Sequence, residues 1–481
     1  MLIQTKNLDE NSLAPQQLEW LYCGLDGVLT REVSDVLLDK ISRDPAAELN
    51  YGFNRALQNI AFSMQARGIR VDEPGRKAAI VKIWADGQST RKLADVEAHK
   101  LVGHGFKWGE KALPPSPHAI IKVFYDELGL RPYKSKTGSR TTDKDALTKL
   151  GKRDPQTARL CTLIQELRDL EKQREVLETG LSHDGRIRSM FNVGQAETDR
   201  WSSNSDTYGC GTNLQNLDSR IRSVFIPDPG YEFCEVDLEQ GESRCVAYLA
   251  GDEGYIAAHE SGNTHTQAAR NWWPELKLPT DNAAAKRQLK ETQVPWVVMA
   301  GEGEASKSYY DVSKNRQHGF NYGRTARSVA IMEGVRVSVG QAALDAHFGA
   351  FPGIPRWHQT EKAMLLSTSV QITPLGYRRQ FFGPPRDDHT IKEALANGPQ
   401  SMSVQILNIG MYRVWRDLDN GSDFMLLQQG HDSFLAQVKI GKRDLYGPLI
   451  HAKMRVPVMV HGREMTIPCK IAWGKNWGEM G

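Results

Sequence analysis

Two aspartates lie where a chain can hold divalent cations. Asp237 follows the alternating stretch 233–236, which predicts a half-buried strand, and a helical pattern comes after it. Asp432 lies in the short turn between the apolar runs 424–429 and 434–438, which predict a β-hairpin. Mg²⁺ prefers few carboxylates together with substrate phosphates, so this pair suits phosphoryl transfer with two metal ions. A helix cap at Asp237 and a purely structural turn at Asp432 are the alternatives.

A second set of reactive side chains recurs at helical spacing. Lys314, His318 and Tyr322 follow one another at intervals of four residues, so a helix would present them on one face. A cation, a planar ring and a phenol on one face can neutralise the charge of a triphosphate and stack on a base. Because the unperturbed pKa of histidine is about 6.5, His318 is expected to tighten nucleotide affinity as the pH falls from about 8 to 6.5.

Composition narrows the class of protein. The chain has 481 residues and a formal net charge of +3, so any contact with nucleic acid must come from local basic clusters. The six cysteines show neither CxxC pairs nor regular spacing, which disfavours a zinc site and a disulfide scaffold. We find neither the GxxxxGK[ST] loop of P-loop ATPases nor an apolar run of membrane-spanning length. The sequence therefore predicts a cytoplasmic protein with reduced thiols and no membrane partner.

The elements that must position these residues can also be read. Apolar residues at helical spacing before Gly68 predict an amphipathic helix over residues 50–68. A second helical pattern runs over residues 158–179, and the loop 134–142 is rich in Lys, Arg, Ser and Thr. A charged helical hairpin with a basic tip can follow phosphates, although a solvated surface is the simpler interpretation.

The first aspartate begins a longer match. Residues 237–244 closely resemble motif A of the family A DNA polymerases, D-x-S-Q-I-E-x-R, with Glu239 and Gly241 in place of Ser and Ile. The matching residues are Asp237, Gln240, Glu242 and Arg244.

The helical set belongs to a second match. Residues 314–323 resemble motif B, K-x-x-x-[FY]-G-x-x-Y-G, with His318 at the aromatic position and Tyr310 where the family has an arginine. A rival register that places 321–323 on the family's N-F-G would lose Lys314. Residues 430–433 resemble the H-D-E of motif C, with Ser433 replacing the glutamate.

Shorter runs occur in the family's order as well, and they resemble its D-G-R-I-H, T-G-R-L-S-S, N-L-Q-N, D-I-H-T, T-x-x-G-R-R-R, N-x-P-x-Q and G-x-x-W elements. They cover residues 184–188, 198–204, 213–216, 262–266, 373–379, 396–400 and 474–477. Asp199 replaces a glycine of the second run, and an extra loop, 205–212, follows it. The resemblance implies DNA contacts by Arg200, Thr198, Asn213, Gln215, Asn216, Asn397, Gln400, His431 and Arg244.

The resemblance implies an α+β fold shaped like a right hand, with a palm of antiparallel sheet and mostly helical fingers and thumb. The expected parts are 1–45, a remnant of an exonuclease-like segment; 46–185, the helix that leads into the palm and the thumb; 186–255, palm with motif A; 256–395, fingers with motif B; and 396–481, palm with motif C. The first part rests on Tyr22 and Asp26, whose spacing resembles one exonuclease motif, Y-x-x-x-D.

The reaction that the resemblance implies is the addition of dNTPs to a primer 3′-hydroxyl on a DNA template, with release of pyrophosphate. Two Mg²⁺ ions would be bound by Asp237, Asp432 and the carbonyl of Leu238. Nucleotide contacts are expected from Gln240, Glu242, His318, Tyr322, Lys314 and His265. Lys314 would assist the leaving pyrophosphate, and Glu242 would exclude a 2′-hydroxyl.

Primer-template DNA and dNTPs are the expected partners, with a separate exonuclease or a processivity factor as further candidates. The departures from the family pattern suggest a phage enzyme acting in the cytoplasm of a bacterial host. Ser433, His318 and Tyr310 also admit a degenerate, non-catalytic DNA-binding subunit. A single-subunit RNA polymerase or a reverse transcriptase is the other alternative, and Glu242 argues against the RNA polymerase.

Overall fold

The protein is described here by a computed structural model, which covers residues 13–104, 108, 113–135, 137–206, 210–262, 264–296 and 307–480. Several expectations touch residues outside this part of the chain: the beginning of the exonuclease-like segment (1–12), the tip of the basic loop (136), the centre of the extra loop (207–209), Asn263 of the D-I-H-T-like run, and Gly481.

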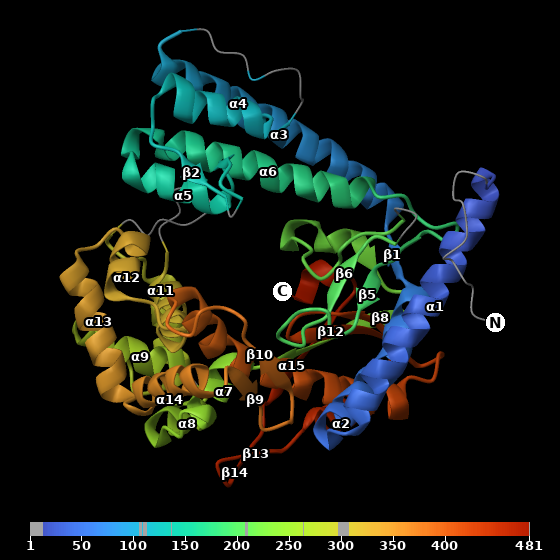
Figure 1. The fold of residues 1–481 in the computed structure, drawn as a ribbon. Coiled ribbons are helices and arrows are strands. Elements are labelled where there is room, and N and C mark those ends of the chain that lie inside the picture. Colours follow the sequence, from blue (N-terminus) through green and yellow to red (C-terminus); the bar gives the residue numbers. More distant parts are fainter. Residues whose placement is uncertain are drawn as a thin grey trace.

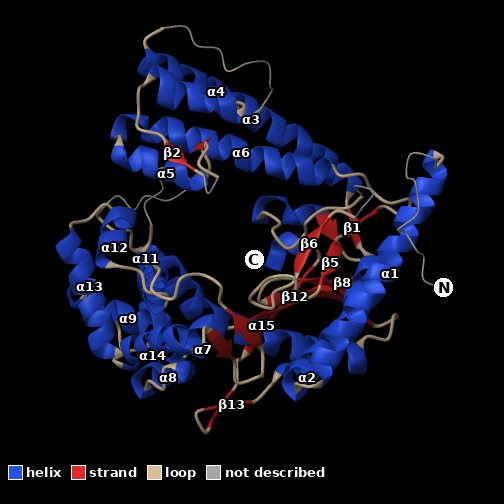
Figure 2. Ribbon diagram, viewed as in Figure 1, coloured by secondary structure: helices blue, strands red, loops and turns tan. Residues whose placement is uncertain are grey.

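A four-stranded antiparallel sheet forms the centre of the molecule (Figure 2), in the order β11-β12-β8-β15. These strands are Phe424–Gln429, Ser433–Lys439, Tyr231–Leu238 and Cys469–Gly474. The apolar side chains of β8 and β12 pack against α2 (Pro45–Arg67), α7 (Gly241–Leu249) and the long α15 (Asp388–Leu418) in one continuous core. The sheet therefore sets the positions of both motif A and motif C.

A helical group with its own hydrophobic core lies at the top of Figure 1. Its main helices are α3 (Glu73–Val102) and α6 (Ala158–Glu178), which pack along one another, with α4 (Pro117–Ile121) and α5 (Lys144–Arg153) beside them. The short hairpin of β2 (Tyr133–Lys134) and β3 (Arg140–Thr141) carries the basic loop.

A second helical group lies to the left in Figure 1 and contains α9 (Thr264–Trp272), α11 (Tyr309–Asn321), α12 (Ala326–Glu333) and α13 (Val337–Ala350). A buried ion pair at 2.6 Å joins Arg316 of α11 to Glu333 of α12, and the Arg316 guanidinium also lies over the ring of Trp273. These contacts fix which face of α11 is turned away from the core, and that face carries Lys314 and His318.

The remaining elements lie within or between these groups. The helices are α1 (Pro15–Ser42), α8 (Glu253–Glu260), α10 (Asn282–Glu291), α14 (Gly353–Ser367) and α16 (Arg443–Met454), with short helical turns η3 (Lys122–Glu127), η4 (Pro155–Thr157), η5 (Ser219–Val224), η6 (Pro274–Leu276) and η7 (Trp477–Met480). The strands are β1 (Ile69–Val71), β4 (Arg186–Ile187), β5 (Met190–Asn192), β6 (Ser202–Asn204), β7 (Phe225–Ile226), β9 (Val370–Ile372), β10 (Arg378–Gln380), β13 (Val458–Val460) and β14 (Arg463–Met465).

The predicted elements are confirmed: the helix over 50–68 is the C-terminal part of α2, the pattern over 158–179 is α6, and the hairpin is β11 and β12. The α+β fold class is also confirmed. Three expected domain boundaries fall inside helices, since 45–46 lies in the first turn of α2, 255–256 within α8 and 395–396 within α15. In the described part of the chain, no helix combines the length and the apolar character needed to cross a membrane.

Candidate active site

The sheet brings the two aspartates together. Asp237 near the end of β8 is the register partner of Ser433, the first residue of β12, so Asp432 stands directly beside it. The Leu238 N–H donates to the Asp432 carbonyl at 3.0 Å, which ties the two strand ends. Two carboxylates far apart in the sequence thereby share one edge of the palm.

Burial and neighbouring negative charge act together on Asp237. Partial burial, together with the charges of Asp432, Glu235 and Glu239, raises the pKa of Asp237 to about 7, against the opposing effect of Lys470. Among the described residues, no three His, Cys, Asp or Glu side chains form a metal site by themselves. A cation held here would therefore need the two aspartates together with backbone or substrate oxygens, which is a set of ligands that suits Mg²⁺.

The turn after Asp237 is shaped by two residues. Gln240 adopts the left-handed conformation, with φ 54°, and its carbonyl accepts a hydrogen bond from Ser243 Oγ at 3.2 Å. Any Cβ added to Gly241 would collide with Ser403 Oγ of α15. A larger side chain at this position would therefore require the Ser403 hydroxyl to move.

Glu242 is the centre of a polar bridge across the site. One of its carboxylate oxygens accepts from Arg200, and the other accepts from Tyr322 Oη at 2.6 Å. Burial and the Glu242 charge raise the pKa of Tyr322 well above its ordinary value, so Tyr322 stays a hydrogen-bond donor. The bridge joins three sequence runs that were expected to act separately: Glu242 on the sugar, Arg200 on DNA and Tyr322 on the nucleotide.

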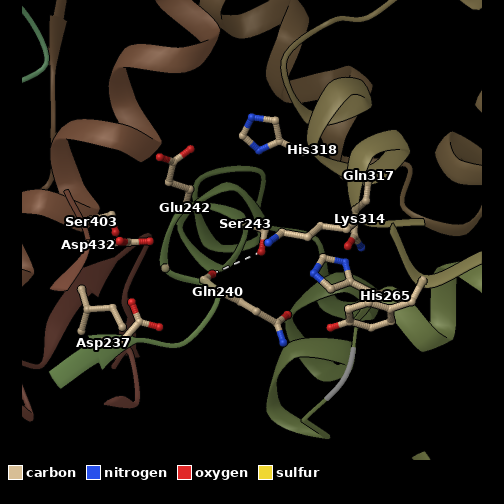
Figure 3. Close-up of a pocket in the computed structure, with 13 residues that line it drawn as sticks. Asp237, Gln240, Glu242, Ser243, His265, Lys314, Gln317, His318, Ser403 and Asp432 are labelled. Atoms are coloured by element: carbon tan, nitrogen blue, oxygen red, sulfur yellow. Dashed lines mark hydrogen bonds between the residues drawn. The ribbon is translucent and has the colours of Figure 1, made fainter. Parts of the chain in front are cut away.

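A cavity of about 340 Å³ separates the sheet edge from α11. Figure 3 shows Asp237 and Asp432 on one side, Lys314 and His265 on the other, and Glu242 between them. Its lining comprises Asp237, Leu238, Gln240, Gly241, Glu242, Ser243, His265, Tyr310, Lys314, Gln317, His318, Ser403 and Asp432.

The pKa values of both histidines that line the cavity are lowered. Burial lowers the pKa of His265 to about 4. His318 reaches solvent at the rim and meets Tyr322 edge to face at 4.8 Å, but partial desolvation, together with the charges of Arg324 and Lys314, lowers its pKa as well, against the opposing effect of Glu242. His318 is therefore neutral over more of the pH range than its unperturbed pKa implies.

The residues expected to contact nucleic acid fall into two groups. Gln215 Nε2 donates to Gln429 Oε1 at 2.6 Å, and Asn216 Oδ1 lies 3.1 Å from His431 Nε2, so this group gathers beside Asp432. Asn213 holds the turn itself, because its Oδ1 accepts from the N–H groups of Gln215 and Asn216.

The second group lies away from the cavity. Arg244 is buried and donates to the His259 carbonyl at 3.0 Å. Asn397 is fully buried in α15, where its Oδ1 accepts from Arg379 at 3.3 Å. These two side chains do not reach the cavity surface. Thr198 and Gln400 are half-buried.

Asp199, which replaces a glycine of the family pattern, keeps a backbone conformation typical of glycine. It has a φ of 59°, a conformation that favours the glycine of the pattern. Its carboxylate accepts hydrogen bonds from Asn54 and Gln405, yet burial raises its pKa to about 6.

Glu235 is a site residue that motif matching missed. It lies two residues before Asp237 on the same face of β8, accepts a hydrogen bond from Trp477 Nε1 at 3.2 Å, and lines a second cavity of about 240 Å³ with Asp237 and Asp432. The alternation of strand residues could have revealed it.

Tyr22 and Asp26 are the two residues whose spacing resembles an exonuclease motif. They lie one turn apart on α1, and both are exposed.

Comparison with known proteins gives a consistent result. A model described as DNA polymerase family A matches residues 85–479. DNA polymerase I of Mycobacterium tuberculosis (strain H37Rv) is 25% identical over 468 residues, covering 93% of this chain and 46% of that protein. The thermostable DNA polymerase I of Thermus filiformis is 24% identical over 444 residues, covering 88% and 47%. The chain thus spans about half the length of the curated relatives it matches.

A solved structure described as the POL domain of Pol1 from M. smegmatis, in complex with DNA primer-template and dNTP, superposes with a TM-score of 0.72. The two chains are 22% identical, and the match covers 93% of this chain and 74% of the other. This likeness shows a shared fold.

Proposed function

We propose that this chain, which belongs to DNA polymerase family A, adds dNTPs to a primer 3′-hydroxyl under the direction of a DNA template. The observation that carries the proposal is the cavity in which Asp237 and Asp432 face Lys314. Acids on one wall and a cation on the other suit a reaction that joins a hydroxyl to a triphosphate and releases pyrophosphate.

Asp237, Asp432 and the Leu238 carbonyl would hold two Mg²⁺ ions. When bound, such ions neutralise phosphate charge and favour deprotonation of the attacking hydroxyl. The raised pKa of Asp237 supports this assignment, since a cation would stabilise a carboxylate that is partly buried beside other carboxylates.

The protein's own side chains would do the remaining work. Lys314 would donate a hydrogen bond or a proton to the departing pyrophosphate. Glu242, held by Arg200 and Tyr322, would present a fixed carboxylate beneath the sugar and leave no room for a 2′-hydroxyl. Gln215, Asn216 and His431 would bind the primer-template beside Asp432.

Primer extension with the four dNTPs and Mg²⁺ tests this function. We expect templated extension that requires the metal and is lost in Asp432→Asn. DNA binding without extension would support the non-catalytic alternative, and a preference for NTPs would support an RNA polymerase. Proofreading or processivity supplied by another protein, and action in the cytoplasm of a bacterial host, remain predictions.

A further inference from the structure

The nucleotide cavity is short of positive charge. Three carboxylates line it, namely those of Asp237, Glu242 and Asp432, and among its described lining residues Lys314 is the only one with a permanent positive charge. The pKa of each lining histidine is lowered. A nucleoside triphosphate therefore needs cations that the immediate lining does not supply.

Tyr310 marks the place where such a cation is missing. It lies on α11 one turn before Lys314 and lines the cavity, but its phenol carries no charge, since burial raises its pKa. Its ring also contacts His265 edge to face at 5.7 Å. The ring is therefore part of the cavity wall on the side away from the aspartates.

Two lysines of α10 converge on this ring. Lys286 Nζ lies 5.6 Å from the ring centroid of Tyr310, and Lys290 Nζ lies 5.5 Å from it. The two residues are four apart and so share one face of α10. Lys286 is also close enough to His265 for its charge to lower the pKa of that cavity residue.

The charges of both lysines are available for a ligand. Both side chains are exposed, and neither forms an ion pair with any carboxylate in the described part of the chain. Two ammonium groups on one ring repel each other, and an anion placed between them would relieve that repulsion. Both lysines lie against Tyr310, one helical turn from Lys314, so a phosphate is the anion that fits.

We propose that Lys286 and Lys290 bind the terminal phosphate of the incoming nucleoside triphosphate, with Tyr310 as the aromatic platform that holds both ammonium groups at the cavity edge. This assignment rests on the proposed function. The α10 lysines thus provide from a neighbouring helix the charge that α11 lacks at Tyr310, and Tyr310 is a positioning residue.

The test compares the double variant Lys286→Ala/Lys290→Ala with the control Arg287→Ala. The control removes one positive charge from a different face of the same helix. All three residues are exposed, so folding should be unaffected. Loss of two charge-assisted contacts should raise the KM for dNTP roughly tenfold, with little change in kcat or in DNA affinity. Arg287→Ala should behave as the wild type.

Two variants of Tyr310 separate the contribution of the aromatic ring from that of the lysine charges. Tyr310→Phe keeps the ring and should retain the wild-type KM, whereas Tyr310→Leu should raise the KM for dNTP by about threefold, because cation–π contacts at exposed sites are weak.

Direct binding makes the result independent of catalysis. Titration of the full chain with a dNTP and with pyrophosphate, each without primer, should show weaker binding by the double variant for both ligands. If the wild type fails to extend primers but shows this difference, the proposed function fails and the lysine assignment stands. Unchanged dNTP and pyrophosphate binding in the double variant would overturn the assignment, as would a loss confined to DNA affinity, which would place the lysines on the template backbone.

Discussion

The two walls of the nucleotide cavity assemble their charges by different means. On the sheet wall, Asp237 and Asp432 come from distant parts of the chain and meet through the antiparallel register of β8 and β12. On the helix wall, Lys314 and His318 are neighbours on α11 and meet through helical periodicity. The sheet wall concentrates like charges that a cation would neutralise, and in the proposed function the helix wall would place separate groups along the triphosphate. Substitution of an aspartate on the sheet wall should therefore abolish nearly all primer extension. Substitution of a residue on the helix wall should reduce the extension rate only in part.

The largest expected effect comes from the sheet wall. Asp237→Asn and Asp432→Asn should each lower the extension rate by on the order of 10³-fold, because charge stabilisation of phosphoryl transfer is lost. Single-turnover extension measures the rate, and fluorescence anisotropy should show nearly unchanged DNA affinity. Glu239→Gln is the matched control and should keep its activity, because Glu239 lies two residues after Asp237 but is exposed and outside the cavity lining. Substantial extension by either asparagine variant would remove the metal-binding assignment.

On the helix wall, Lys314→Ala should lower kcat by about 10²-fold, since one donor to developing charge is lost. Lys314→Arg should recover part of the rate because it restores the charge. The exposed neighbour Asn315→Ala serves as the control. A loss as complete as that of the aspartate variants would contradict the graded character of this wall.

Glu242 joins the two walls and should govern the choice of sugar. Glu242→Ala should increase the use of ribonucleotides relative to dNTPs by roughly tenfold, a value typical of steric discrimination. Competition between a dNTP and its NTP in single-nucleotide extension gives the ratio. Arg200→Ala tests the bridge, since a Glu242 released on one side should discriminate less sharply. An unchanged ratio in both variants would place the sugar gate elsewhere.

The burial of Asp237 and its repulsion by Asp432 should also make the stability of the fold depend on pH. A carboxyl group whose pKa is raised in the folded state destabilises the fold progressively as the pH rises from its unfolded value of about 3.9 through about 7. Without divalent metal, Asp237→Asn should therefore raise the Tm by a few degrees at pH 8 and leave it unchanged at pH 4. Calorimetry in the presence of a chelator measures this. If the variant and the wild type had the same Tm at pH 8 as well as at pH 4, the repulsion would be screened.

The smallest expected effect concerns His318. Its lowered pKa means that protonation accompanies nucleotide binding mainly at low pH, so dNTP affinity should tighten chiefly below about pH 6.5 rather than between 8 and 6.5. His318→Phe should flatten this part of the profile. Comparing the two enzymes cancels the titration of Asp237. Parallel profiles would show that His318 acts only as a ring.

Local patterns were enough to predict much of this molecule. Apolar periodicity located α2, α6, β11 and β12, because burial of one face depends on residues close in sequence. The spacing of Lys314 and His318 was enough to place them on one face of α11, and the alternating pattern before Asp237 was enough to place this residue near the end of a strand.

Tertiary structure decided what those residues contact. The sequence contains no local signal that Glu242 would bind both Arg200 and Tyr322, that α15 would bury Asn397, or that α10 would bring two lysines to Tyr310. The physical reason is that a helix or strand pattern specifies which face is buried, whereas the partner of that face depends on the packing of segments far apart in the chain.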